Sequence, residues 1–162
     1  MSGNGALAWV MALAAVLGGM SGCVSNQTRG IENRALDLVN RERVSAGLEP
    51  LVMDDAVRGV ARAHSADMAA RHFASHDNPD GVNPFQRLDA AGIPYAWAGE
   101  NIAWNDFRTP AEAALTAWMG SAEHSGNILR AQFTRTGMGV AADGAGGYYF
   151  TQVFIGGDQP GR

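Results

Sequence analysis

The chain has 162 residues, of which 12 are basic and 16 acidic, so its net charge is −4. This length predicts one domain whose core is large enough to fold without a disulfide or a metal. The mild negative charge and the lack of a basic patch argue against a nucleic-acid partner. A single cysteine excludes an internal disulfide.

The N-terminal 23 residues carry no charged side chain and contain an apolar run from Ala6 to Leu17. The run is too short to span a bilayer comfortably and is typical of the apolar region of an export signal. Met20-Ser21-Gly22-Cys23 follows, and it resembles the cleavage motif of bacterial lipoproteins, in which the cysteine becomes the lipidated N-terminus. We therefore predict a signal peptide over residues 1–23 and lipidation of Cys23. An ordinary cleaved signal with an incidental cysteine is the alternative.

Two helices are predicted in the first half of the chain. Residues 24–30 are polar and are expected to form a linker. The first helix is expected from Ile31 to Ala46, because apolar residues recur at helical spacing and Gly47 suits the position after a C-terminus. A second helix should begin at Asp54 or Asp55, either of which can cap it, and should continue to about Arg71.

Shorter elements follow. Asn83 and Pro84 are the predicted cap and first residue of a short helix after a turn at 77–81. Gly99–Trp104 is a predicted strand, in which a glycine precedes an acid, an amide and an apolar run. Thr109-Pro110-Ala111-Glu112 has the pattern of a capping box with proline at the first helical position, and it predicts a helix to about Met119.

The end of the chain is rich in residues that favour strands. Two such runs, 137–142 and 148–155, are separated by a glycine-rich segment and predict a β-hairpin. Helices in the first part and strands in the last predict an α+β fold, with helices on both faces of a small antiparallel sheet.

Two histidines and one acid are the first candidates for a site. His76 lies where the second helix gives way to a turn, Glu100 opens the predicted strand, and His124 lies in a polar segment after the helix that ends near Met119. We predict that these three residues meet in one cleft. Two imidazoles with a carboxylate match zinc-type ligation, and a carboxylate beside a histidine raises the pKa of the imidazole. A buried network that only satisfies its own polar atoms is the structural alternative.

The other two histidines are weaker candidates. His64 lies on the apolar face of the second helix and is expected to be a core residue. His72 and His76 are four positions apart, but the turn signals place His76 at or beyond the helix end, so we do not expect a metal pair. The chain has no His-Glu-x-x-His or Gly-x-Ser-x-Gly motif that would indicate a zinc protease or a serine hydrolase. Asn127 is expected to have a structural role.

Taken together, these motifs resemble a bacterial CAP domain, of the superfamily named for cysteine-rich secretory proteins, antigen 5 and pathogenesis-related 1 proteins. The resemblance runs from about Glu32 to Gly156. The segments that carry it are, in order, Ala61–Met68, Ser75-His76 with residues 79–81, Gly99–Ile102, Trp118 with residues 124–129, and Gly137–Val140. It implies a three-layer α-β-α sandwich over residues 31–157, followed by a tail at 158–162, and an extracellular or cell-surface location.

The resemblance also implies a central cleft with two histidines and two acids. His76, Glu100 and His124 match three of these positions. The fourth, a glutamate about three residues after the helix tryptophan, is replaced here by Ser121, and Glu123 is nearby but offset. We expect a triad of His76, Glu100 and His124 with Glu123 at its rim.

The predicted function is that of an exported, lipid-anchored binding domain without established catalysis. Its cleft would hold zinc or another divalent cation through His76 and His124, or a small or lipid ligand. One alternative is a protease-like hydrolase in which a histidine and Glu100 activate water directly or through a metal. Another is a purely structural envelope protein. Membrane contact is expected through the lipid anchor only, and the sequence leaves the natural ligand and the oligomeric state open.

Overall fold

The computed structural model describes residues 18–157, with side chains from residue 26 onward. The predicted apolar signal run, the side chain of Cys23 and the predicted tail at 158–162 lie outside this description. Within the described range, no helix combines the length and hydrophobicity that a bilayer crossing needs.

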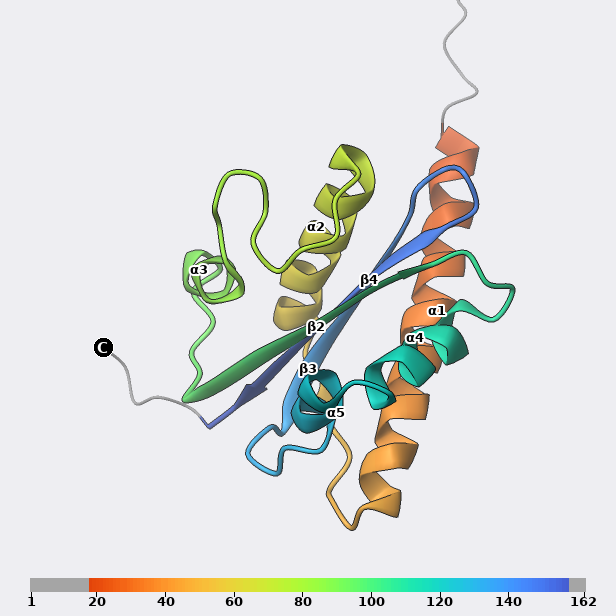
Figure 1. The fold of residues 1–162 in the computed structure, drawn as a ribbon. Helices are drawn as coiled ribbons and strands as arrows, with labels where there is room; N and C mark the ends of the chain where they lie inside the picture. Colours follow the sequence, from red (N-terminus) through yellow and green to blue (C-terminus); the bar gives the residue numbers. More distant parts are fainter. Residues whose placement is uncertain (1–17, 158–162) are drawn as a thin grey trace, which may run out of the picture.

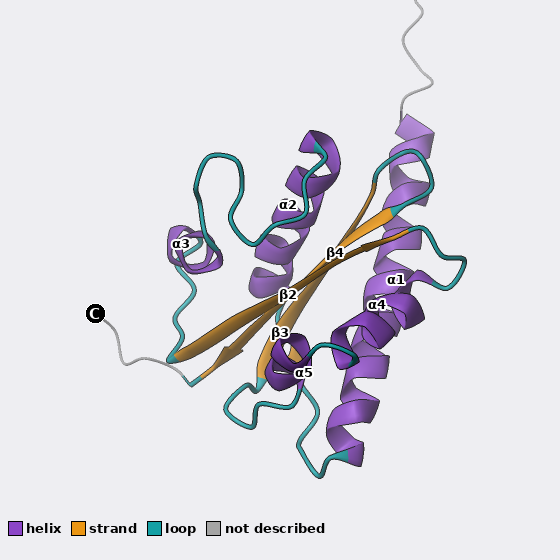
Figure 2. Cartoon of the chain, viewed as in Figure 1, coloured by secondary structure: helices purple, strands orange, loops and turns teal. Residues whose placement is uncertain are grey.

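The described residues form an α+β fold in three layers (Figures 1 and 2). The helices are α1 (Gly18–Ser45), α2 (Asp55–Arg71), α3 (Pro84–Ala90), α4 (Pro110–Met119) and α5 (Ala122–Ile128). The strands are β1 (Val52–Met53), β2 (Trp97–Asn105), β3 (Arg135–Ala142) and β4 (Tyr148–Gly156). Helices α1, α4 and α5 lie on one side of the sheet, and α2 and α3 lie on the other. The predicted fold class is confirmed.

The strand order in the sheet is β1-β3-β4-β2. β2 and β3 both pair antiparallel with β4, so that Asn101 and Met138 lie on either side of Gln152. β1 runs parallel to β3, and the sheet is therefore mixed, not wholly antiparallel as predicted. The parallel strand was missed because two residues cannot show a period. β2 is an edge strand. It contacts α3 on one face of the sheet and α4 and α5 on the other.

Helix α1 begins earlier than predicted. Residues 24–30, expected to form a linker, belong to this helix. Their polar side chains show no apolar face, which is the signal on which the prediction depended. One of them nevertheless contacts the sheet, because Gln27 donates to the hydroxyl of Tyr148 at 2.9 Å. The helix ends at Ser45, and Gly47 follows with a φ of 76°, as the predicted C-terminal glycine requires.

Helix α2 packs directly on β3 because that strand presents two glycines to it. A Cβ atom at Gly137 would lie 2.2 Å from the backbone carbon of Val57, and one at Gly139 would lie 2.3 Å from that of Ala61. Any larger residue at either position would push the helix off the sheet. This close packing holds the N-terminal half of α2 on the sheet, and the loop that carries His76 follows the other end of the same helix.

The predicted helix starts are confirmed in part. Asp54 caps α2, and Asn83 forms a capping box with Gln86 at the start of α3. Pro110 is the first residue of α4 as predicted, but in the described structure the Thr109 side chain makes no cap hydrogen bond. The capping box predicted there is wrong, because Glu112 pairs instead with Arg34 of α1 at 2.9 Å.

The core is divided by the sheet. The larger cluster lies on the side of α1 and α4, where Trp118 packs edge-on against Phe150 and Phe133 stacks on Phe154. A smaller cluster lies under α2 and α3, and it includes Val57, Ala61, Leu88, Val153 and Ile155. The two clusters hold β2 from both faces, so the groups on this edge strand occupy fixed positions.

Candidate functional site

The site is built on the edge strand β2, at the sequence Gly99-Glu100-Asn101. A Cβ at Gly99 would lie 2.9 Å from the Phe133 ring and 3.1 Å from the side-chain oxygen of Asn127, so only glycine allows this close approach. Because successive side chains of a strand point to opposite faces, Glu100 is directed towards α3 and Asn101 towards α5. Glu100 therefore contacts α3 on one face of the sheet, and Asn101 contacts α5 on the other.

Glu100 is buried and has a charged or polar partner on each carboxylate oxygen. Its residue surface is 6% exposed. Oε1 accepts a hydrogen bond from Nδ1 of His76 at 2.9 Å, and Oε2 accepts one from the Arg87 guanidinium at 2.8 Å. A buried carboxylate needs such partners to offset its lost hydration. The predicted contact between His76 and Glu100 is present.

Arg87, on α3, is a site residue that the sequence did not reveal. One nitrogen of its guanidinium donates to the backbone oxygens of His76 and Val82, at 3.0 and 2.9 Å, while another reaches Glu100. A single side chain thus ties both ends of the 76–82 loop to Glu100. The available signal was an arginine directly before the buried Leu88, which is too common a pattern to predict this role.

The loop that carries His76 is held by a second residue, Asn78. Its side-chain oxygen accepts from the backbone N–H groups of Asp80 and Val82, and its amide donates to Asp67 of α2. Helix α2 ends before this loop, since His72 has a left-handed backbone with a φ of 55°. His72 and His76 therefore do not share a helical face, in agreement with the prediction.

His124, on α5, is positioned from the other side of β2. The Asn101 amide donates to the His124 backbone oxygen at 3.1 Å. Asn127 donates to the backbone oxygen of Glu100 and to the side-chain oxygen of Asn101, at 3.2 and 3.0 Å. These bonds lock α5 onto the strand and give Asn127 the structural role predicted for it. Among the described residues, the hydrogen bonds of His124 run through its backbone.

The serines beside His124 serve the helix. Ser121 caps α5 by accepting a hydrogen bond from the backbone N–H of His124, and the Ser125 hydroxyl donates to the Ser121 backbone oxygen at 2.7 Å. Ser121 occupies the position at which the family resemblance places an acid. Glu123 is exposed on the first turn of α5. No hydrogen bond joins its carboxylate to another described residue, but its charge contributes to raising the pKa of His76 and opposes the lowering of the pKa of His124.

His76 and His124 have opposite pKa shifts. The hydrogen bond with Glu100 is the main reason that the pKa of His76 is raised above its ordinary value, and the charges of Glu100 and Glu123 act in the same direction. The pKa of His124 is lowered, chiefly by burial and further by the charge of His76. His124 is therefore the better neutral ligand, while a proton competes for His76.

His76 and His124 are the two residues that the sequence predicts as metal ligands. In the described part of the chain, no three His, Cys, Asp or Glu side chains form a group that could hold a metal ion. Both oxygens of Glu100 already have partners, which leaves that carboxylate as a neighbour of His76 and not as a third free ligand.

His64 lies in the interior. It is 2% exposed, and its Nε2 forms a hydrogen bond with the backbone oxygen of Ser75 at 2.9 Å. Its Nδ1 has no hydrogen-bond partner among the described residues. Burial lowers the pKa of His64, so the neutral ring is favoured. The predicted core position is confirmed.

Comparison with known proteins places the chain among bacterial relatives. It is 40% identical over 125 residues to the uncharacterized protein YkwD of Bacillus subtilis, covering 77% of this chain and 47% of that protein. It is also 36% identical over 124 residues to the uncharacterized membrane protein YlbC of the same organism, covering 76% and 34%. The chain thus spans half or less of the length of these curated relatives.

A solved structure agrees with these sequence matches. An extracellular protein containing an SCP domain from Bacillus anthracis superposes with a TM-score of 0.76 and 31% identity, covering 89% of this chain and 45% of that one. The model of the cysteine-rich secretory protein family, CAP, matches residues 36–154, which include His76, Arg87, Glu100, Glu123 and His124. The chain belongs to the cysteine-rich secretory protein (CAP) family.

Proposed function

We propose that the protein is an exported lipoprotein whose cleft binds a divalent cation through His76 and His124. The observation that carries this proposal is the bond from Nδ1 of His76 to Glu100. A carboxylate that accepts from one ring nitrogen fixes the tautomer, so the other nitrogen presents its lone pair, and metal-binding histidines commonly have such a partner. Arg87 holds the carboxylate in place for this purpose.

The donor set suits zinc or a similar borderline cation. Two imidazoles are ligands that such ions prefer, and burial keeps His124 neutral. With two protein ligands, the remaining coordination positions would go to water or to a small ligand. A cation bound there would polarise an oxygen atom of that ligand. The expected affinity is modest, because most protein zinc sites have three or four protein ligands.

Export and lipid anchoring are supported by the N-terminal sequence. The apolar run Ala6–Leu17 precedes the lipoprotein-like motif that ends at Cys23. The relative from Bacillus anthracis is described as extracellular. Growth with a labelled fatty-acid analogue tests the anchor. Label is expected on the wild-type chain and not on Cys23→Ala, and label that persists in the variant would contradict lipidation of this residue.

Cation binding is tested by calorimetric titration of the chain from Cys23 onward with Zn²⁺. His76→Ala and His124→Ala should each weaken binding at least roughly tenfold, because each removes half of the protein ligands. His72→Ala is the matched control, since His72 lies outside the cleft at the end of α2. Unchanged zinc affinity in the His76→Ala, His124→Ala double variant would reject the proposed site.

The pH dependence of zinc binding gives a further expected result. A cation and a proton compete for His76, whose pKa is raised. Zinc affinity should therefore fall as the pH is lowered through that pKa, as measured by the same titration at several pH values.

A further inference from the structure

Two large aromatic side chains are exposed where β2 ends. Trp104 is 48% exposed and Phe107 is 64% exposed. Trp104 is nevertheless fixed in place: its indole N–H donates to Asp143 at 3.2 Å, and its ring lies 6.4 Å from that of Tyr149. It also lies against Gly147, where a Cβ would be 2.8 Å from the indole nitrogen. The indole of Trp104 is thus held in a fixed orientation while about half of the residue remains exposed at the protein surface.

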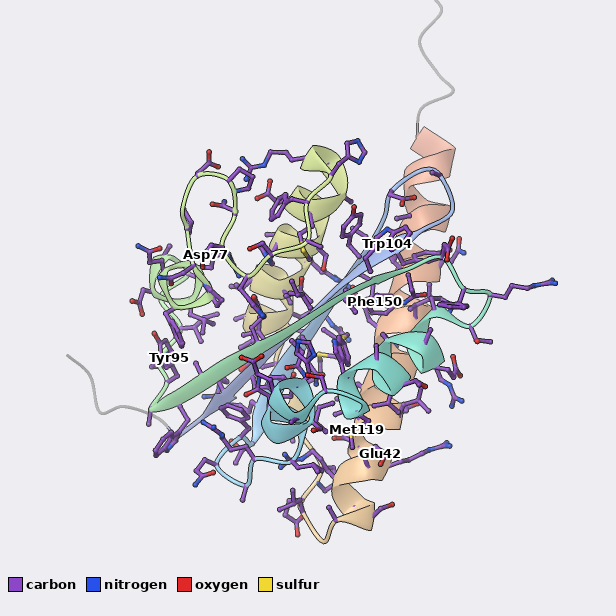
Figure 3. All side chains as sticks on the ribbon, in the orientation of Figure 1. Glu42, Asp77, Tyr95, Trp104, Met119 and Phe150 are labelled. Carbon is purple, nitrogen blue, oxygen red and sulfur yellow. The ribbon has the colours of Figure 1, made fainter. Side chains whose placement is uncertain are left out.

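These aromatics share one end of the sheet with the start of α1. Gln27 of α1 bonds to Tyr148, and Tyr148 pairs across the strands with Asn105, the last residue of β2. Figure 1 shows the first turns of α1, the β3–β4 loop and the loop after β2 along one side of the molecule. Trp104 is labelled on this side in Figure 3, far from Tyr95, which precedes the other end of β2.

The helical start of α1 places the predicted lipid-carrying residue close to this end. Cys23 is four positions before Gln27 and belongs to the same helix. At 1.5 Å per residue, the two are separated by about 6 Å along the helix axis. A lipid on Cys23 would therefore hold this end at the bilayer surface.

We propose that this end docks on the lipid surface, with Trp104 and Phe107 in the interfacial region of the bilayer. The docking rests on the lipid anchor of the proposed function. Tryptophan favours this region because its ring is apolar and its N–H is polar, and here the N–H already has a partner in Asp143.

Charge contributes little to this docking. Exposed Arg29 and Arg108 are balanced by Asp106 and by Asp143, whose carboxylate also accepts from the backbone N–H groups of Ala145 and Gly147. The aromatics therefore supply the contact, and the tether supplies a high local concentration of bilayer. The chain without a tether should bind vesicles weakly.

Quenching of tryptophan emission by brominated phospholipids tests the docking. The chain from Cys23 onward contains Trp97, Trp104 and Trp118. Trp118 is 1% exposed, while Trp97 is 49% exposed, as much as Trp104, but lies at the opposite end of β2. Trp97→Phe and Trp104→Phe therefore form a matched pair that differs only in which exposed tryptophan remains.

The lipoprotein is purified from membranes, reconstituted into phosphatidylethanolamine–phosphatidylglycerol vesicles, and compared with and without bromine on the acyl chains. In Trp97→Phe, which keeps Trp104, the brominated lipid should quench roughly half of the fluorescence emitted by Trp104. Trp104→Phe should lose little. Adding Phe107→Ser to Trp97→Phe should reduce the quenching, and Phe107 is exposed enough that this change leaves the fold intact. Equal quenching of the two single variants would overturn the docking.

Coupling the chain through Cys23, its only cysteine, to a maleimide-bearing lipid separates docking from natural lipidation. Strong quenching of Trp104 in this form supports the docking surface. If mass spectrometry of the cellular protein also shows no lipid on Cys23, the lipid-anchor proposal fails. The surface could then bind lipid in vitro but would not be held at a membrane in the cell. Natural lipidation without preferential quenching of Trp104 overturns the docking alone.

Discussion

Glu100 determines both the orientation and the protonation of His76. Its carboxylate accepts from the histidine on one oxygen and from Arg87 on the other, in a buried position where each bond is strengthened by the low local dielectric. The charge of Glu123 also favours the protonated form of His76, but without a hydrogen bond to it among the described contacts. Glu100 and Glu123 therefore have unequal effects on the pKa of His76.

Replacing Glu100 by glutamine should lower the pKa of His76 towards that of a free histidine, because the hydrogen bond to a charged partner is the main cause of the upward shift. The pKa is measured by following the His76 ring resonances in an NMR titration. Glu123→Gln is the control and should lower the pKa less. Equal shifts in the two variants would show that general charge, and not this bond, sets the protonation of His76.

At the scale of secondary-structure elements, the contact between α2 and β3 holds the scaffold of the site. Gly139 lies against the backbone of Ala61, and Ser65 on the same helix donates to the Gly139 backbone oxygen at 3.0 Å. The C-terminal end of α2 carries the loop with His76, so a displacement of the helix would move that histidine relative to Glu100.

Gly139→Ala should destabilise the protein by about 3 kcal/mol, because its methyl group would overlap the α2 backbone. Gly59→Ala is the matched control on α2 itself. A Cβ at Gly59 would meet no atom within 4 Å, so the same change should stabilise the helix by roughly 0.5–1 kcal/mol. Urea unfolding of both variants checks the opposite signs, and similar free energies of unfolding would contradict this account of the packing.

The sequence predicted most helices and the long strands because their signals are local. Asn83-Pro84 starts α3 and Gly47 follows the end of α1, because each of these residues favours the required backbone conformation without help from distant residues. The start of α1 and the parallel strand β1 were missed, since the first has no apolar face and the second has only two residues. The capping box at Thr109 was lost to a long-range competitor, Arg34, which no local pattern reveals.

The candidate site was also predictable only in part from the sequence. His76 and Glu100 were paired correctly because the family motifs place them together. Arg87 was not found, because its role depends on how α3 is set against β2 and on the carbonyl groups of a loop. The sequence does not show that three acceptors, the backbone oxygens of His76 and Val82 and the Glu100 carboxylate, lie within reach of this arginine.

At the scale of the whole molecule, the histidines oppose one another in the pH dependence of stability. The pKa of His64 is lowered by burial, so it contributes stability that is present above the unfolded-state pKa of about 6.5 and is lost as the pH falls through its lowered folded pKa. His124 acts in the same sense. His76, whose pKa is raised, contributes stability at low pH that is lost as the pH rises through its folded pKa.

Because His64 is the most buried of the three, the protein should lose stability between about pH 7 and pH 5 through this residue. The His64→Gln variant keeps a donor for the Ser75 oxygen and should show a shallower loss over the same range, whatever its absolute stability. Urea unfolding at several pH values measures this slope. A variant slope as steep as that of the wild-type chain would assign the acid sensitivity elsewhere.

The proposed cation would be held between the rings of His76 and His124 while Glu100 remains bonded to His76 and Arg87. The most direct test is a crystal of the chain from Cys23 onward grown with Zn²⁺, with anomalous scattering recorded at the zinc absorption edge. We expect one strong peak within ligand distance of both rings, with the bonds of Glu100 intact. A peak ligated by Glu100 after displacement of Arg87, or no peak at these histidines, would contradict the proposal.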